Sequence, residues 1–356
     1  MKHYNIPIFI PHLGCPYNCI FCNQEKITSQ SQPTSNLEIQ EILVSHLHTI
    51  PASSAIVEAA FFGGNFTALP REEQKKYLQA VSSFIREGRI DSIRVSTRPD
   101  YIDPEGLDFL KDWGVGTIEL GVQSFANSVL RASRRGYQSE EAEKACLLIR
   151  QKGFKLGIQL MIGLPGDSYE LDIYSTRKAI EVKPDLVRIY PAVIISGTAL
   201  EEMYIKGDYI PLSLEDAIKI SADMLLQFQK QGIKVIRIGL QPSDELLKPG
   251  GIIAGPFHPS FGELVEQEIF KRQAEELIKR FLAGKQDIIE LVLLVNPRDV
   301  SKMIGSHRQN ITYLKKRFNL HQVKVKADPG IGLDTIRLGI NEPFSLSRND
   351  YINGRV

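Results

Sequence analysis

Apolar runs and amphipathic segments alternate along the first two thirds of the chain. From residue 5 to about 240, short β-branched runs are followed by segments of ten to twenty residues with helical apolar spacing. Several runs, such as 158–162 and 185–190, are mostly apolar, which is typical of strands covered on both faces. The pattern predicts an incomplete α/β barrel with parallel strands at residues 6–10, 56–62, 91–96, 116–121, 156–162, 185–190 and 233–238.

The repeat stops after about residue 240. A Pro- and Gly-rich loop follows, and then a helix to about Leu282 for which Ser260 and Glu263 form an expected capping box. Residues 283–287 have the composition of a linker. The expected order after the linker is strand, helix, break, helix, strand, strand, at residues 288–295, 297–304, 305–308, 308–318, 322–327 and 334–340.

These elements predict four parts. Residues 1–240 form the barrel, 241–285 a connecting loop and a helix that covers the barrel, 286–345 a small α+β domain, and 346–356 a tail. A chain of 356 residues is long enough for one large and one small domain.

Composition narrows the possible partners. Lys and Arg total 43 and Asp and Glu total 42, so no global positive field favours nucleic acid or a membrane surface. Any RNA contact must therefore be local. No run approaches the ~20 apolar residues of a membrane-spanning helix, and the N-terminus lacks the layout of a signal peptide. We expect a cytoplasmic protein without a membrane partner.

Three of the four cysteines lie close together near the N-terminus. Cys15, Cys19 and Cys22 form a CxxxCxxC loop after the first expected strand, a spacing too tight for disulfides that would brace a chain of this size. A site-differentiated 4Fe–4S cluster takes three thiolates and leaves one iron open for a ligand. A structural zinc would need a fourth ligand, and His12 is poorly placed for that role. The loop therefore predicts a 4Fe–4S cluster.

The ends of later strands carry small and polar residues. In α/β barrels the loops after the strands converge on one mouth, so these residues are expected beside the cysteine loop. They are Gly63, Gly64 and Asn65 after the second strand, Ser96 after the third, Gln123 after the fourth, and Gly163 to Gly166 after the fifth.

Together these motifs resemble the radical S-adenosylmethionine (SAM) superfamily. The cysteine loop with Phe21 before its third cysteine, the Gly-Gly loop and the barrel pattern carry the resemblance. The barrel is also similar to that of the catalytic subunit of Elongator, a tRNA-modifying enzyme, over about residues 6–240. The matching stretches are residues 63–67, 97–101, 119–124, 163–166, 189–191 and 197–198.

The resemblance implies a partial (β/α)6-type radical SAM barrel that holds a 4Fe–4S cluster and S-adenosylmethionine. One electron, from a donor such as a flavodoxin or ferredoxin, would cleave the sulfonium bond and release a 5′-deoxyadenosyl radical that abstracts hydrogen. The protein's part is to orient and shield that radical.

The resemblance also implies cofactor contacts. It places Gly63 and Gly64 beside the methionyl amino group, Gln123 at the ribose and Arg135 at the carboxylate, with Asn65 as a further cofactor-binding residue. Gln123 could instead only close a strand end, and Arg135 could belong to a solvated basic helix surface. Ser96 stands where related barrels often carry glutamate, and Gln159 where porphyrinogen-oxidising relatives carry an acid. Both replacements weaken the expected SAM contacts at these positions and disfavour porphyrin chemistry.

Absent elements narrow the expected reaction. Cys146 lies in an amphipathic segment and is expected to be core packing. Because one cysteine cannot hold a second cluster, methylthiolation by the usual two-cluster route is disfavoured. The residues after 285 are too few for the acetyltransferase domain of the Elongator subunit or for a cobalamin-binding domain. We expect hydrogen abstraction with an unspecified product.

The order of elements over residues 288–340 and the sequence Ile304-Gly305-Ser306-His307-Arg308 resemble a K-homology RNA-binding domain. In that family the turn between the helices clamps the RNA backbone. Arg308 replaces the second glycine of the signature, so a modified clamp is expected. An accessory domain with solvated basic residues is the alternative. The expected RNA contacts are Lys302, Gly305, Ser306, His307, Arg308, Lys315 and Lys316.

The favoured hypothesis is a radical SAM enzyme that modifies a nucleotide in tRNA or rRNA. Two alternatives stay open. One is a radical SAM enzyme for a small molecule or peptide, whose C-terminal domain only covers the barrel. The other is an RNA-binding iron–sulfur sensor that does not cleave SAM.

Overall fold

The computed structural model describes residues 2–10, 19–23, 26, 34–51, 55–241, 243–283, 288–340 and 344–354. They form two compact units. The first unit comprises residues 1–213 and 233–257, and the second comprises residues 214–232 and 258–356.

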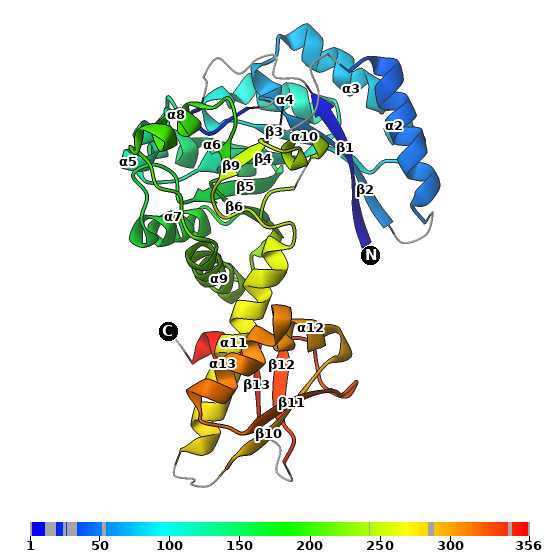
Figure 1. Cartoon of the computed structure of the whole chain (residues 1–356). Coiled ribbons are helices and arrows are strands. Elements are labelled where there is room, and N and C mark those ends of the chain that lie inside the picture. The colour runs from blue at the N-terminus through cyan, green and yellow to red at the C-terminus, as the bar shows by residue number, and fades with distance from the viewer. Residues whose placement is uncertain are drawn as a thin grey trace. The chain divides into compact units, whose positions relative to one another are not determined.

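A seven-stranded parallel sheet forms the first unit (Figure 1). Its order, β1-β2-β3-β4-β5-β6-β8, follows the chain, so each strand is reached by a crossover connection from its neighbour. All seven predicted strands are present and the partial barrel is confirmed. The strands are β1 (Lys2–Ile10), β2 (Ala55–Gly63), β3 (Ser92–Thr97), β4 (Val115–Gln123), β5 (Lys155–Ile162), β6 (Leu186–Pro191) and β8 (Lys234–Ile238).

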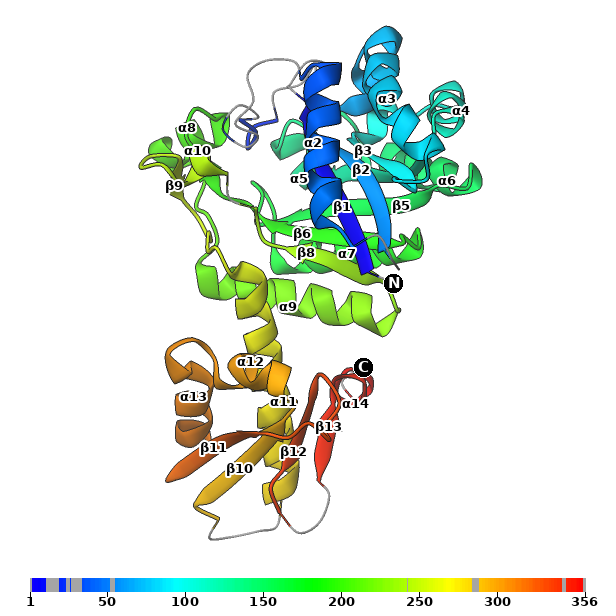
Figure 2. The same cartoon turned by 90° about the vertical axis from the view of Figure 1, so that its right-hand side faces the viewer.

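Helices connect these strands and lie along the outer side of the sheet (Figure 2). Side-chain caps define several starts, because Ser35, Asp103 and Ser168 each accept a hydrogen bond from a first-turn amide. Among the described residues, no helix is long and apolar enough to cross a membrane. The helices are α2 (Asn36–Thr49), α3 (Arg71–Arg86), α4 (Pro104–Asp112), α5 (Asn127–Ala132), α6 (Ser139–Gln151), α7 (Tyr169–Glu181), α8 (Ala199–Lys206) and α10 (Asp244–Leu247), and a short ribbon pairs β7 (Ile194–Ile195) with β9 (Ile252–Ala254).

The second unit is a four-stranded sheet with helices on one face. Strands β10 and β11 are parallel, whereas β12 is antiparallel to β10 and β13 is antiparallel to β12. The predicted order strand, helix, helix, strand, strand is present. The elements are α9 (Leu214–Lys230), α11 (Phe261–Leu282), β10 (Glu290–Val295), α12 (Val300–Ile304), α13 (Gln309–Arg317), β11 (Gln322–Ala327), β12 (Thr335–Leu338), β13 (Ser345–Ser347) and α14 (Arg348–Asn353).

The compact units differ from the four parts expected from the sequence. Helix α11, expected to cover the barrel, groups with the C-terminal strands. Its buried Gln273 donates hydrogen bonds to the carbonyl oxygens of Asp334 and Leu346. The expected tail contains β13 and α14, and the buried Arg348 binds Gln273 at 3.0 Å and Glu266 at 2.9 Å. These polar contacts join α11 to the end of the chain.

One expected helix cap is wrong. Helix α11 begins after Ser260, but the Ser260 side chain makes no capping hydrogen bond. Its backbone has φ −104° and ψ 36°, outside the extended region in which a capping side chain reaches the first-turn amides. Residues 284–287 of the expected linker at 283–287 lie outside the described residues.

Two carboxyl groups pair at the start of α7. Burial, the negative charge of Asp167 and a hydrogen bond with that residue raise the pKa of Asp172 to about 10. Burial raises the pKa of Asp167 to about 6. Asp172 therefore keeps its proton at neutral pH and shares it with Asp167. Because the pKa of Asp172 is higher in the folded chain than its ordinary value of 3.8, this pair loses stability as pH rises from about 4 towards 10.

We expect Asp172→Asn to remove this pH dependence, since an amide donates to Asp167 without needing a bound proton. The variant should match the wild type in urea denaturation near ~pH 4 and exceed it increasingly up to ~pH 8.5. Asp112→Asn, at an exposed position of α4, is the control and should follow the wild type throughout. Parallel pH profiles of the Asp172 variant and the wild type would contradict the shared proton.

Candidate functional site

A cavity of about 580 Å³ lies at the carboxyl ends of the strands of the first unit. Residues from both ends of the sheet contribute to it, from Pro7 of β1 to Leu240 and Gln241 after β8. All seven residues expected to contact the cofactor line this one cavity. They are Gly63, Gly64, Asn65, Ser96, Gln123, Arg135 and Gln159.

Two of the three predicted cluster cysteines are described, and both line the cavity. The Cys22 amide donates to the Cys19 carbonyl oxygen at 3.0 Å, so the chain turns between them. Cys19 is 6 % exposed and Cys22 is half-buried. Cys15 lies outside the described residues. Cys146 is fully buried in α6, where burial raises the pKa of its thiol to about 12, and it does not line the cavity.

Two guanidinium groups converge on the Cys19 sulfur. Arg135 donates to it at 3.0 Å and Arg98 at 3.4 Å. Arg98 also forms a two-point pair with Asp100 at 2.9 and 2.8 Å, and donates to the Arg135 carbonyl oxygen. Burial opposes the charged form of Arg135, but the neighbouring Tyr137 and Cys19 outweigh it and raise the pKa of Arg135 above its ordinary value. Arg135 is therefore a buried site residue and not part of a solvated helix surface.

The Gly-Gly loop after β2 presents an unused donor. Gly63 has φ 107°, a conformation that favours glycine. The Asn65 oxygen accepts from the Thr97 hydroxyl at 2.5 Å and from the Arg98 amide at 3.3 Å. Because an amide N–H only donates, these contacts fix the orientation of the Asn65 side chain. Its buried Nδ2 has no hydrogen-bond partner among the described residues.

The amides of Gln123 and Gln159 meet on neighbouring strands. Gln159 Nε2 donates to Gln123 Oε1 at 3.4 Å. Gln123 has φ 69°, unusual for a residue other than glycine, and the pairing of β4 with β5 shifts between Gly121 and Gln123. Strained backbone of this kind is concentrated at functional sites. Ser96 lies on β3 beside them, opposite Glu119 of β4.

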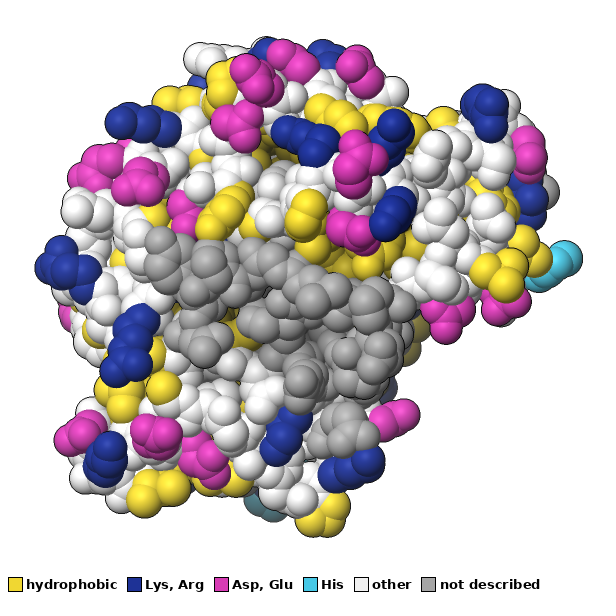
Figure 3. All heavy atoms as spheres, turned by 90° about the horizontal axis from the view of Figure 1, so that it is seen from above, with side chains coloured by type: hydrophobic (Ala, Val, Ile, Leu, Met, Phe, Trp, Pro, Cys, Tyr) yellow, Lys and Arg dark blue, Asp and Glu magenta, His cyan; other side chains and the backbone are white. Residues whose placement is uncertain are grey.

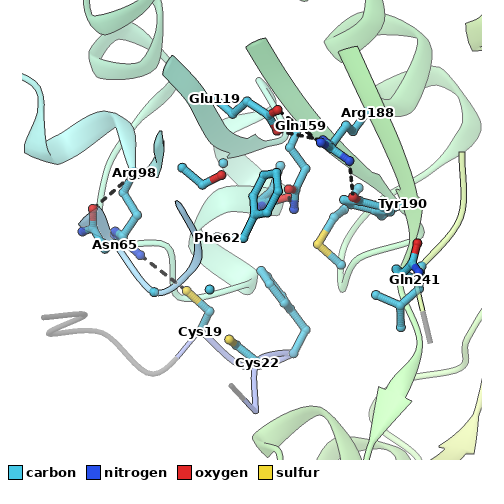
Figure 4. Close-up of a pocket in the computed structure, with 18 of the residues that line it drawn as sticks. Cys19, Cys22, Phe62, Asn65, Arg98, Glu119, Gln159, Arg188, Tyr190 and Gln241 are labelled. Carbon is cyan, nitrogen blue, oxygen red and sulfur yellow. Dashed lines mark hydrogen bonds and ion pairs between the residues drawn. The ribbon is translucent and has the colours of Figure 1, made fainter. Parts of the chain in front are cut away.

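The side of the cavity away from the cysteines is charged, which motif reasoning missed. Figure 4 shows Cys19 and Cys22 on one side, Glu119 and Arg188 on the other, and Phe62 between them. Arg188 binds Glu119 through Nε at 2.7 Å and through a second nitrogen at 3.2 Å. The Arg188 guanidinium also lies 5.4 Å from the centre of the Phe62 ring. The sequence signal that could have indicated this charged side is the presence of Glu119 and Arg188 within otherwise apolar strands.

A second buried charge cluster lies beneath Glu119. Arg94, 1 % exposed, contacts both Glu58 and Glu119, and Glu58 also accepts from Thr117 at 2.7 Å. Burial disfavours the ionised Glu58, yet the charge of Arg94 keeps the pKa of Glu58 below its ordinary value. The inner face therefore holds paired charges, as buried ionic groups require.

The residues predicted to bind RNA lie together in the second unit but differ in exposure. His307, Arg308, Lys315 and Lys316 are exposed. Gly305 is buried with φ 76°, and a Cβ there would lie 2.9 Å from Asn310 and Gln309, so local packing requires the glycine.

Two of these positions already have protein partners. The Ser306 amide donates to Gln267 of α11 at 2.9 Å. Lys302 binds the buried carboxylate of Asp299 at 3.0 Å. The four exposed residues are the better candidates for an external ligand.

Family comparisons agree with this geometry. The Radical SAM superfamily model matches residues 9–175, and the Radical SAM C-terminal domain model matches residues 184–271. The chain belongs to the radical SAM superfamily. Members of this superfamily bind a 4Fe–4S cluster and S-adenosylmethionine. The residues fit these groups, because Arg135 and the Asn65 Nδ2 are buried cavity-lining donors that suit anionic ligands.

Two of three similar relatives have names that refer to tRNA. A tRNA uridine(34) acetyltransferase of Methanocaldococcus infernus is 30% identical over 209 residues, which is 58% of this chain and 38% of the relative. The enzyme of that name from Methanocaldococcus jannaschii is 33% identical over 184 residues, 46% of this chain and 34% of the relative. Elongator complex protein 3 of Mus musculus is 28% identical over 254 residues, 60% and 46% of the two chains. The chain thus spans less than half the length of these relatives.

A solved structure shares the fold. The archaeal Methanocaldococcus infernus Elp3, with an N-terminal deletion, superposes with a TM-score of 0.60 and 24% identity over 76% of this chain and 63% of that chain. This likeness concerns the architecture of the sheet and its helices.

Cys19→Ala should abolish cluster assembly, because it removes one of three thiolates and the sulfur on which two arginines converge. We expect loss of the brown iron–sulfur absorbance and of bound iron after anaerobic reconstitution. Cys146→Ala is the matched control and should retain both, since its thiol is buried away from the cavity. Normal iron content in the Cys19 variant would contradict the assignment.

Proposed function

We propose that the chain reductively cleaves S-adenosylmethionine and uses the resulting radical to modify a nucleotide in tRNA or rRNA. The observation that carries the proposal is the single cavity that joins the cysteine loop to a separate polar wall at Glu119 and Arg188. One side suits the cofactor and the other suits a second ligand. The names of two relatives, both tRNA uridine(34) acetyltransferases, support RNA as the source of that ligand.

When bound, the cluster and S-adenosylmethionine supply an electron and a 5′-deoxyadenosyl radical, and the electron comes from a donor such as a flavodoxin or ferredoxin. In the proposal the chain positions these groups. The bare backbone of Gly63 and Gly64 lets a ligand approach closely, and the Asn65 Nδ2 donates to it. The amides of Gln123 and Gln159 face the ligand between the two sides of the cavity.

The polar wall suits a group that both accepts and donates hydrogen bonds. Glu119 offers carboxylate oxygens, Arg188 offers N–H groups, and Tyr190 contributes a hydroxyl 3.5 Å from Arg188. Phe62 supplies a ring face beside them. A nucleobase has such an edge and a flat face that stacks on aromatic rings. Enzymes that act on a base take it out of its stack and bind it in such a pocket.

RNA docking in the proposal belongs to the second unit. Its helix–turn–helix between β10 and β11 has the K-homology order, and His307 and Arg308 lie at the exposed turn with φ 49° and φ 61°. Lys315 and Lys316 are exposed on α13. On the face seen in Figure 3, Lys and Arg side chains lie among Asp and Glu side chains. A local basic surface is therefore the relevant electrostatic feature.

The double change Arg308→Glu with Lys316→Glu should abolish RNA retention by the reconstituted protein. It reverses two exposed positive charges, one in the turn before α13 and one on α13. Retention is measured by extracting RNA that copurifies from cell extract, with iron–sulfur absorbance as the check on folding. The control reverses Lys324 and Lys326, exposed on β11, where the intervening Val325 is half-buried. It carries the same net charge change and should retain RNA. If the variant with Arg308→Glu and Lys316→Glu retained as much RNA as the wild type, the docking proposal would be wrong.

The product is found by mass spectrometry of nucleosides from total RNA of a deletion strain and its parent. We expect one modified nucleoside to disappear in the deletion strain and to return with the wild-type gene but not with Cys19→Ala. Identical nucleoside profiles, together with deoxyadenosine formation that a metabolite pool stimulates and RNA does not, would instead support a small-molecule substrate. No reductive cleavage of SAM under dithionite would support the sensor hypothesis.

A further inference from the structure

Arg135 differs from the other buried arginines of the described chain in its partners. Arg94 contacts Glu58 and Glu119, Arg98 contacts Asp100, and Arg348 contacts Glu266. Arg135 is 4 % exposed, yet among the described residues no carboxylate lies within ion-pair distance of it. Its contacts are the Cys19 sulfur, the Tyr137 hydroxyl and the Gly121 carbonyl oxygen.

A buried guanidinium without a carboxylate needs another anion. Removing a charge from water costs several kcal/mol unless a charge of opposite sign and hydrogen bonds replace the solvent. Tyr137 and Gly121 provide hydrogen bonds but no full charge. The Cys19 sulfur, at 3.0 Å, is the contacting atom that becomes anionic when it serves as a metal ligand.

The geometry of Arg135 holds it on that sulfur. Tyr137 accepts from Nε at 3.2 Å and from one terminal nitrogen at 3.0 Å, and that nitrogen also contacts Gly121. The other terminal nitrogen donates to Cys19. Of the five N–H groups of a guanidinium, four are thereby engaged by the protein and one remains for a further ligand. The contact with Cys19 does not need S-adenosylmethionine.

We infer that Arg135 is a positioning residue that raises the reduction potential of the cluster through Cys19. A reduced cluster carries one more negative charge than the oxidised cluster, so a fixed neighbouring cation stabilises the reduced state. Hydrogen bonds to cluster sulfurs act in the same direction. Arg98 contributes less, because Asp100 offsets its charge and its contact with Cys19 is longer, at 3.4 Å. This inference rests on the cofactor part of the proposed function and not on its RNA substrate.

The test is an EPR-monitored redox titration of the anaerobically reconstituted full chain, without S-adenosylmethionine or RNA. Arg135→Gln, which removes the charge but keeps an amide donor, should lower the midpoint potential. The reduced-to-oxidised ratio at a fixed potential should fall tenfold or more, which is 59 mV for a one-electron couple. Arg135→Lys, which keeps the charge, should recover part of the shift. Arg131→Gln removes an exposed arginine on neighbouring α5 and should leave the midpoint unchanged.

An unchanged midpoint in Arg135→Gln, with weaker binding of S-adenosylmethionine, would overturn the inference and assign Arg135 to the cofactor carboxylate alone. If Arg135→Gln fails to retain iron, Arg135→Met, which also removes the charge, takes its place, and a midpoint equal to that of the wild type overturns the inference. A lower midpoint in either variant supports it. A lower midpoint in Arg135→Gln, found for a chain whose wild type modifies no RNA, would support the role of Arg135 and contradict only the RNA part of the proposed function.

Discussion

Pairing of buried charges fixes the interior of the half-barrel. Strands β2, β3, β4 and β6 point Glu58, Arg94, Glu119 and Arg188 inward, and each guanidinium contacts a carboxylate. Because an unpaired buried charge costs several kcal/mol, a strand that slipped by one residue would leave these groups without partners. The charges thus specify a register that apolar side chains alone specify less strictly. That register also brings the cofactor-site residues to one mouth.

The same constraint distinguishes the two sides of the cavity. Arg188 and Glu119 neutralise each other's charge on the far side. Beside the cysteines, Asn65 Nδ2 lacks a partner within the described chain and Arg135 lacks a carboxylate there. The groups left over therefore gather where a cluster and an amino-acid-like cofactor would bind. The paired groups, Glu119 and Arg188, form the wall of the cavity that suits a second ligand. Whether the polar groups already have partners, more than the shape of the cavity, distinguishes the side that suits the cofactor from the side that suits a second ligand.

The sequence predicted what is local. Continuous apolar runs located all seven strands, and the residues expected after the second, third and fourth strands line the cavity, whereas Gly163 to Gly166 after the fifth do not. The charge cluster escaped prediction because its pairs join distant positions, as Glu119 and Arg188 are 69 residues apart. Arg135 was ambiguous because it lies in a basic run just after the end of α5, where helical periodicity no longer indicates which side chain turns inward. The position of α11 was missed because Gln273 and Arg348, which tie it to the C-terminal strands, carry no sequence signature.

The contact between Gln267 and the turn at Gly305–Arg308 bears on how this unit can be dissected. Gln267 belongs to α11, and its side-chain oxygen accepts from the Ser306 amide while its carbonyl oxygen accepts from Asn310 at 2.9 Å. A fragment that begins at β10 would expose both donors and lose the acceptor that shapes the turn. The conformation of the turn therefore depends on α11. A fragment that is meant to keep this turn folded should begin at α11 and not at the first strand of the small sheet.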